Sequence, residues 1–249
     1  MTGWLASVAN TEEIPLILPA GPDILDLKDP AAGALGAWAV DDIAATVREL
    51  AALPERPRLS ATIGDHPMRP EAVEPAARRV AGTGVDFVKI GFAPDGAPDR
   101  CIDVLAPLAA EGVQLVAVLF ADLWPPDPGC LPIDRLASAG FRGAMLDTAG
   151  KRHGLRHHWH DANLSAFVCC TRAHGLLTGL AGSLRVADIP ALSALSPDYL
   201  GFRGALCGGE RTAGIDPQAA ARVAAAIAGL RGGLPGATPQ PRPSPPSRS

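Results

Sequence analysis

The chain has 249 residues, of which 47% are hydrophobic, so it can bury the core of one large domain. Its formal net charge is −4 and it has no Lys/Arg run, which argues against a nucleic acid partner. It contains neither an apolar run of about 18 residues nor a signal-like N-terminus, so we expect a cytoplasmic protein without a membrane span.

Short β-like runs alternate along the chain with helical patterns. The predicted strands are residues 5–9, 24–28, 59–63, 87–91, 115–120, 144–147, 177–180 and 200–202. The predicted helices are residues 40–52, 71–80, 102–110, 164–174 and 217–230. Asp41 or Asp42 is the expected cap of the first helix, and Asp216 with Pro217 is the expected start of the last.

Eight strands with helices between them predict an α/β fold of the (β/α)8 type, the TIM barrel. A doubly wound open sheet is the alternative, but no GxGxxG motif follows the first strand to favour it. We predict one catalytic barrel domain over residues 1–232 and a disordered, Pro-rich tail over residues 233–249.

Lysine is rare in this chain. Only Lys28, Lys89 and Lys151 occur beside 19 arginines, and each lies in or just after a predicted strand. Arginine replaces lysine in most surface roles, but a guanidinium stays protonated and cannot attack a carbonyl. An Arg-rich composition alone could explain why lysines are few. It explains their placement at strand ends less easily, and this placement favours imine or acid–base chemistry.

Asp26 and Lys28 lie two positions apart in the second predicted strand, so their side chains point to the same side. Active sites of such barrels lie at the C-terminal ends of the strands, where Lys89 also ends the fourth strand. A carboxylate positions an amine and can relay its proton, although it also raises the pKa of the amine, and a second lysine offsets that effect. For any one of these residues taken alone, a structural ion pair is the alternative interpretation. For Asp26, Lys28 and Lys89 taken together, we favour a catalytic role.

Asp147 ends the sixth predicted strand, and Lys151 follows four residues later in the loop. Asp147 is suited to orienting a lysine or to transferring a proton. Its alternative role is to cap the loop that follows it, as Asp at strand ends often does.

Two Gly-rich turns follow the seventh and eighth predicted strands, where barrels most often bind phosphate. Glycine lets backbone N–H groups approach an oxyanion, and an arginine can pair with it in bidentate fashion. We therefore predict a phosphorylated substrate held by these turns through Gly182, Ser183, Arg203, Gly204 and Ala205.

The segment after Lys151 is rich in histidine, with His153, His157, His158 and His160. His153 and His157 have the spacing of metal ligands on one helix face, but no carboxylate or cysteine pattern completes a metal site. The five cysteines form no CxxC pair and no regular framework. We predict a lid or basic rim over the active site, without a metal.

Six segments in this order resemble the (5-formylfuran-3-yl)methyl phosphate synthase family of methanofuran biosynthesis: DILDLKDPAAGALGA, LSATIGD, VDFVKIG, AMLDTAGK, LAGS and GFRGALCGG. The resemblance spans residues 4–230, and the His-rich loop and the tail depart from it. It implies a barrel that condenses two molecules of glyceraldehyde 3-phosphate into a furan aldehyde phosphate, with loss of one phosphate and two waters, for methanofuran or a related C1 carrier.

The resemblance also implies the roles of the site residues. Lys28 would form the Schiff base and Lys89 would transfer protons, while Asp26, Asp147 and Lys151 would support them. Because the imine itself withdraws electrons, no organic cofactor is expected.

Two other functions stay open at this point. A class I aldolase would use the same Lys28 imine on other phosphorylated sugars, but only the furan synthase makes an ultraviolet-absorbing furan aldehyde. A non-catalytic phosphate-binding barrel would keep its function in a Lys28→Arg variant. The sequence also leaves open whether the chain is a monomer or a homo-oligomer.

Overall fold

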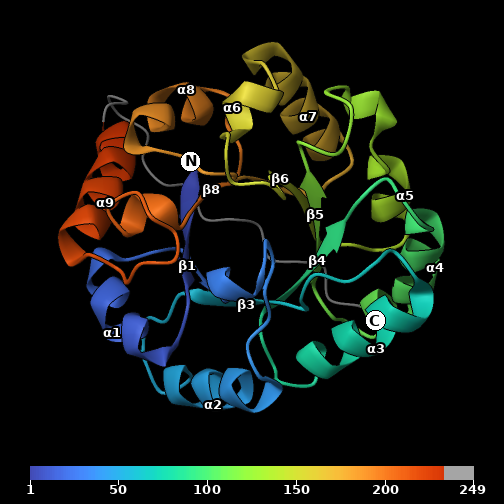
Figure 1. The fold of residues 1–249 in the computed structure, drawn as a ribbon, viewed down its shortest axis with the longest axis horizontal. Coiled ribbons are helices and arrows are strands. Elements are labelled where there is room, and N and C mark those ends of the chain that lie inside the picture. Colours follow the sequence, from blue (N-terminus) through green and yellow to red (C-terminus); the bar gives the residue numbers. More distant parts are fainter. Residues whose placement is uncertain (233–249) are drawn as a thin grey trace, which may run out of the picture.

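The computed structural model describes residues 1–232 and shows a closed barrel of eight parallel strands, ordered β1 to β8 and ringed by helices (Figure 1). The (β/α)8 fold is therefore confirmed. The predicted tail, residues 233–249, lies outside the described residues. Every strand begins and ends within two residues of its predicted bounds: β1 (Gly3–Val8), β2 (Ile24–Leu27), β3 (Arg58–Thr62), β4 (Phe87–Phe92), β5 (Leu115–Phe120), β6 (Gly143–Asp147), β7 (Leu177–Leu180) and β8 (Tyr199–Phe202).

The strands are covered on both faces, and all six residues of β5 are buried. Alternate side chains pack either inside the barrel or beneath the helices. Leu5 and Tyr199 belong to the cluster inside the barrel, whereas Trp4 and Ala6 belong to the larger cluster that includes the helices.

The five predicted helices are present as α2, α3, α4, α7 and α9, and the remaining described helices are short. Their bounds are α1 (Ile14–Ile17), α2 (Val40–Leu50), α3 (Pro70–Ala81), α4 (Pro98–Ala110), α5 (Ile133–Ser138), α6 (Leu155–His158), α7 (Asp161–Ala173), α8 (Ile189–Ala194) and α9 (Pro217–Gly232).

The predicted start of α9 at Pro217 and that of α2 at Val40 are confirmed, but the predicted cap of α2 is wrong. The Asp216 carboxylate accepts a hydrogen bond from the backbone N–H of Gln218 at 2.9 Å, and α9 begins at Pro217. The N-cap of α2 is Ala39, which has no side-chain oxygen to accept a hydrogen bond. Asp41 and Asp42 lie inside the first turn, where they still face the positive end of the helix dipole.

The register of three neighbouring strands places polar side chains side by side inside the barrel. Asp26 in β2 is level with Ser7 in β1 and with Ser60 in β3, and all three are buried. Lys28 follows β2 directly, and its backbone N–H still bonds to the Val8 carbonyl at 3.1 Å. The strand pairing thus continues up to the residue that presents the amine.

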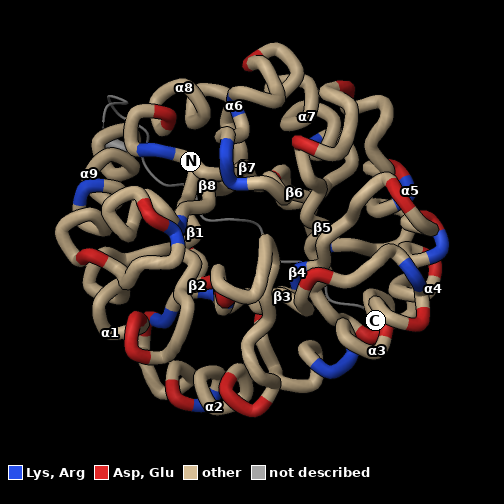
Figure 2. The backbone as a smooth tube through the Cα atoms, in the orientation of Figure 1, with Lys and Arg blue, Asp and Glu red and all other residues tan. Residues whose placement is uncertain are grey.

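Charges of both signs are spread around the outer ring of helices (Figure 2). Within residues 1–232, no helix is both long enough and apolar enough to cross a membrane. The five cysteines all lie in this part of the chain and carry free thiols.

Candidate active site

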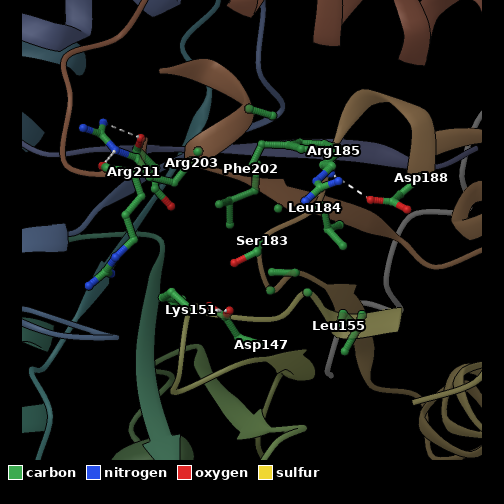
Figure 3. Close-up of a pocket in the computed structure, with 18 of the residues that line it drawn as sticks. Asp147, Lys151, Leu155, Ser183, Leu184, Arg185, Asp188, Phe202, Arg203 and Arg211 are labelled. Carbon is green, nitrogen blue, oxygen red and sulfur yellow. Dashed lines mark hydrogen bonds and ion pairs between the residues drawn. The ribbon is translucent and has the colours of Figure 1, made fainter. Parts of the chain in front are cut away.

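A cavity of about 660 Å³ lies at the C-terminal ends of the strands, and the loops after β2, β6, β7 and β8 line it (Figure 3). All three lysines of the chain are among its lining residues. In total, nine Lys or Arg residues and two Asp residues line the cavity, whereas the whole chain is acidic. The cavity is therefore suited to an anionic ligand.

Asp26 is fully buried below the cavity and accepts three side-chain hydrogen bonds. The donors are the Ser60 hydroxyl at 2.6 Å, the Ser7 hydroxyl at 2.9 Å and the Lys89 ammonium at 2.9 Å. Burial opposes the charge of Asp26. The charges of Lys89 and Lys28 and the hydrogen bonds outweigh burial, so the pKa of Asp26 lies below its ordinary value.

Lys89 is only 2% exposed and bonds to Asp26. Burial lowers the pKa of Lys89; Asp26 opposes this shift, and the charge of Lys28 adds to it. An amine that releases its proton more readily than an exposed lysine is suited to proton transfer.

Asp147 lies between the other two lysines. Its Oδ1 accepts a hydrogen bond from Lys151 Nζ at 2.9 Å, and its Oδ2 lies 3.7 Å from Lys28 Nζ. Burial opposes the charge of Asp147, but Lys151 and Lys28 outweigh it and hold the pKa of this carboxyl well below its ordinary value. Burial lowers the pKa of Lys151, and Asp147 opposes that shift. Figure 3 shows Lys151 against Asp147 at the cavity.

The structure thus brings together the five residues that the sequence selects as catalytic: Asp26, Lys28, Lys89, Asp147 and Lys151. Asp147 also stabilises its own loop, because its carboxylate accepts a hydrogen bond from the backbone N–H of Thr148 at 2.7 Å. The capping role and the lysine-orienting role, which the sequence presents as alternatives, occur in one side chain.

The two Gly-rich turns border the same cavity. Gly182 has φ +103° and Ser183 has φ +52°, a left-handed turn that directs the chain past the Asp147 loop. Gly204 and Ala205 begin the short helix after β8. In the described part of the chain, the backbone N–H groups of these four residues make no hydrogen bond. They are free to bind an oxyanion.

Arg203 does not fit the phosphate-binding role predicted for it. Its guanidinium pairs with Glu13, at 2.5 Å from Nη1 to Oε2 and 3.0 Å from Nη2 to Oε1. It also donates to the carbonyls of Ser7, Arg211 and Ala213. These contacts use all five N–H groups, and the side chain is buried, so none is left for a phosphate. Arg203 holds the loop together instead.

Sequence reasoning missed Arg211, Ser7 and Ser60. Arg211 lies eight residues after Arg203, in the same Gly-rich segment, and its half-buried side chain lines the cavity. The sequence does not distinguish these two arginines. Ser7 and Ser60 could be found only from the strand register, because serine within a strand carries no signal of its own.

The His-rich segment forms part of the cavity rim. His153 and His157 stack with ring centroids 4.1 Å apart, and His157 lines the cavity together with Arg152 and Arg156. The neighbouring charge of His157 lowers the pKa of His153. Over residues 1–232, no three His, Cys, Asp or Glu side chains are grouped as metal ligands. This geometry agrees with a basic rim.

The chain matches a family model described as 4-HFC-P synthase over residues 4–224. It is 44% identical over 223 residues to a protein of Methylorubrum extorquens named provisionally as a (5-formylfuran-3-yl)methyl phosphate synthase, with 88% of each chain covered. The (5-formylfuran-3-yl)methyl phosphate synthase of Methanothermobacter thermautotrophicus is 35% identical over 224 residues, covering 84% of this chain and 92% of that relative.

Among solved structures, the 3-hexulose-6-phosphate synthase of Salmonella typhimurium has a similar fold, with a TM-score of 0.64. The alignment covers 92% of this chain and 99% of that one at 13% sequence identity. At this identity the likeness shows the barrel fold alone.

Proposed function

The chain belongs to the (5-formylfuran-3-yl)methyl phosphate synthase family, and we propose that it condenses two molecules of glyceraldehyde 3-phosphate into (5-formylfuran-3-yl)methyl phosphate. One phosphate and two waters are lost in this reaction. The product would serve the biosynthesis of methanofuran or of a related C1 carrier. We further propose that the reaction runs through an imine on Lys28.

The state of the Lys28 amine is the observation that carries this proposal. Lys28 Nζ lines the cavity and makes no hydrogen bond within residues 1–232; its nearest carboxylate oxygen, on Asp147, is 3.7 Å away. Lys89 and Lys151 each donate to a carboxylate at 2.9 Å. Of the three amines, that of Lys28 therefore needs the least rearrangement to reach a carbonyl.

In the proposed mechanism, the neutral amine of Lys28 adds to the carbonyl carbon of one triose phosphate. The carbonyl oxygen leaves as water, with one proton from the amine and one taken up from solvent, as the iminium forms. The positive nitrogen then accepts electron density from the adjacent carbon, so the proton on that carbon becomes acidic. Lys89 in its neutral form takes this proton and becomes an ammonium, and the resulting carbon nucleophile adds to the carbonyl of the second triose phosphate. Phosphate elimination, loss of water and ring closure through an oxygen give the furan, and hydrolysis frees Lys28.

The Asp26–Lys89 pair is suited to these proton transfers because burial lowers the pKa of the Lys89 amine, which then releases its proton more readily than an exposed lysine does. Asp147 and Lys151 form a second such pair on the other side of Lys28. The free N–H groups of Gly182, Ser183, Gly204 and Ala205 support phosphate binding at the wall formed by β7 and β8.

A class I aldolase that acts on other phosphorylated sugars remains the second candidate, because the same amine and the same phosphate loops would serve it. The two differ in their product. Incubation with glyceraldehyde 3-phosphate alone should give a furan aldehyde that absorbs in the ultraviolet, whereas an aldolase would give a sugar phosphate without that absorption.

Borohydride trapping tests the imine directly. The protein is incubated with glyceraldehyde 3-phosphate, reduced, digested and mapped by mass spectrometry. We expect a reduced triose adduct on the peptide that contains Lys28, and none there in Lys28→Ala. An adduct on Lys89 or Lys151 would keep the imine and overturn the assignment of roles. Substrate binding with no adduct on any lysine would refute imine catalysis.

A further inference from the structure

Arg211 is a half-buried cation whose donors are largely unused. Its Nη1 donates to the Gly33 carbonyl at 3.1 Å, which is its one side-chain hydrogen bond within residues 1–232. No carboxylate in that range lies within ion-pair distance of it. The other guanidinium N–H groups remain available in a cavity lined by Lys28 and Lys151.

The acids that line the cavity are already engaged. Asp147 binds Lys151 and lies near Lys28, while Asp188 accepts the backbone N–H of Arg185 at 2.9 Å and lies 3.5 Å from Arg156. A negative charge for Arg211 must therefore arrive with a ligand. Arg211 is also close enough to Lys151 for the Arg211 charge to add to the effect of burial in lowering the pKa of Lys151. Two cations so close together favour the binding of an anion between them.

The backbone of Arg211 is fixed from below by Arg203. Arg203 Nε donates to the Arg211 carbonyl at 2.7 Å, and Nη2 donates to the Ala213 carbonyl at 2.7 Å. The buried pair of Arg203 with Glu13 anchors this contact to the segment after β1. Figure 3 shows Arg203 and Arg211 next to one another in this loop. The fold thus holds the backbone of Arg211 in place before any ligand binds, which favours specific binding over a diffuse positive field.

The side chain of Arg211 extends from the β8 loop to the β2 loop, where Gly33 lies. In the closed barrel, β1 separates β8 from β2, so Arg211 spans the sector above β1. The free N–H groups of Gly182 and Ser183 lie in the β7 loop, on the opposite side of β8. The cavity therefore has two separate groups of anion-binding donors.

We propose that Arg211 binds the phosphomonoester group of one substrate molecule, while the backbone N–H groups of the β7 and β8 loops bind that of the other. This assignment rests on the proposed condensation of two triose phosphates. The planar guanidinium can form two parallel hydrogen bonds with phosphate oxygens, which a lysine in its place would not. Arg203 acts as a positioning residue for Arg211.

Calorimetric titration with glycerol 3-phosphate tests the proposal without turnover, because this phosphomonoester has no carbonyl for Lys28 to attack. We expect the wild type to bind two molecules per chain. Arg211→Gln should lose one of them, with its dissociation constant raised about 10- to 100-fold, and Arg211→Lys should recover part of the loss. The KM for glyceraldehyde 3-phosphate should rise in Arg211→Gln, while borohydride still labels Lys28.

Two further variants serve as controls. Arg142→Gln removes an exposed arginine at the opposite end of the barrel, before β6, and should leave both dissociation constants unchanged. Arg185→Gln removes another cation from the cavity lining and should weaken binding less than Arg211→Gln. Two unweakened sites in Arg211→Gln, or equal losses in Arg185→Gln and Arg211→Gln, would overturn the proposal. If no furan forms but Arg211→Gln still loses a site, the phosphate role stands and the proposed reaction fails.

Discussion

Three amines and two carboxylates meet at the base of the cavity, so the fully ionised cluster carries one uncompensated positive charge. An unpaired buried charge is strongly unfavourable, and loss of one proton from an amine makes the cluster neutral. Burial lowers the pKa of Lys89 and of Lys151 in agreement with this reasoning. A neutral amine near neutral pH is what imine formation and proton abstraction both require.

The proposed roles of Lys28 in imine formation and of Lys89 in proton transfer can be tested by measuring imine formation and turnover separately. Lys89→Met should lower kcat for furan formation by about 10²- to 10⁴-fold, the range for loss of a general acid–base. Borohydride should still trap the substrate on Lys28, but more slowly, because loss of Lys89 leaves two amines beside two carboxylates and removes the excess charge that favours a neutral amine. Lys28→Met is the matched control and should lose both signals. Loss of trapping in Lys89→Met would show that Lys89 is needed for imine formation itself.

The Ser60 hydroxyl stabilises a buried charge and can be tested by urea denaturation. Its 2.6 Å hydrogen bond contributes to the lowered pKa of Asp26. Ser60→Ala should reduce the free energy of unfolding at neutral pH by about 1.5–3 kcal/mol, the usual contribution of a hydrogen bond to a charged group. Ser193→Ala is a matched control, because the Ser193 hydroxyl is buried without a partner in the described residues and its removal should reduce stability far less. Equal effects in the two variants would contradict the assigned role of Ser60.

At the scale of the elements, the loop after β8 depends on the helical segment after β1. Glu13, within residues 11–13 of that segment, neutralises Arg203, which in turn holds the backbone of residues 211–213. The Ala9 backbone N–H also bonds to Glu13 at 2.7 Å. One buried ion pair therefore couples the start of the chain to a loop that lines the cavity.

Glu13→Gln should destabilise the protein strongly, because it leaves a buried guanidinium without a countercharge. We expect the free energy of unfolding in urea to fall by about 3–5 kcal/mol and the KM for substrate to rise as the Arg211 segment loses its anchor. Glu74→Gln breaks the exposed Glu74–Arg78 pair on α3 and should change the free energy of unfolding by about 0.5 kcal/mol or less. A change of similar size in both variants would show that the buried pair has no such role.

The elements also show why some features follow from the sequence and others do not. Parallel strands buried on both faces read as continuous apolar runs, so β5 has its predicted bounds. The α5 and α8 helices have only six residues each, too few for a periodic pattern. The role of Arg203 could not be predicted, because its partner Glu13 lies 190 positions away in the sequence. The lysine and aspartate set could be selected because strand ends meet at one face of a barrel.

At the scale of the whole molecule, the charge distribution separates the surface from the site. The chain is acidic and carries both signs around its outer helices (Figure 2), whereas nine of the eleven charged residues that line its cavity are Lys or Arg. The two buried carboxylates at the base of that cavity are ionised because lysines surround them. Their ionisation links the electrostatics of the site to the stability of the entire fold.

This link predicts how stability depends on acid. The pKa values of Asp26 and Asp147 are lower in the folded state than the unfolded value of about 3.9, so their contribution is fully present above that pH. Below it, the unfolded chain binds protons that the folded one does not, and stability falls by about 1.4 kcal/mol per pH unit for each group until the folded carboxyl is protonated. The free energy of unfolding should therefore decline steeply below about pH 4.

Replacing Asp147 shows how much this one carboxylate contributes to the fall in the free energy of unfolding at low pH. Asp147→Asn should be less stable than the wild type at pH 7, and the difference in the free energy of unfolding should shrink steadily as the pH falls below about 4, because the wild type alone loses the charge of Asp147. Arg142→Gln changes an exposed side chain and removes no carboxyl, so its difference from the wild type should not change over this pH range. A constant difference between Asp147→Asn and the wild type from pH 7 to pH 3 would mean that Asp147 is not held ionised by its lysines. In that case three ammonium groups would face a single ionised carboxylate, and the charge count that accounts for one neutral amine in the cluster would no longer hold.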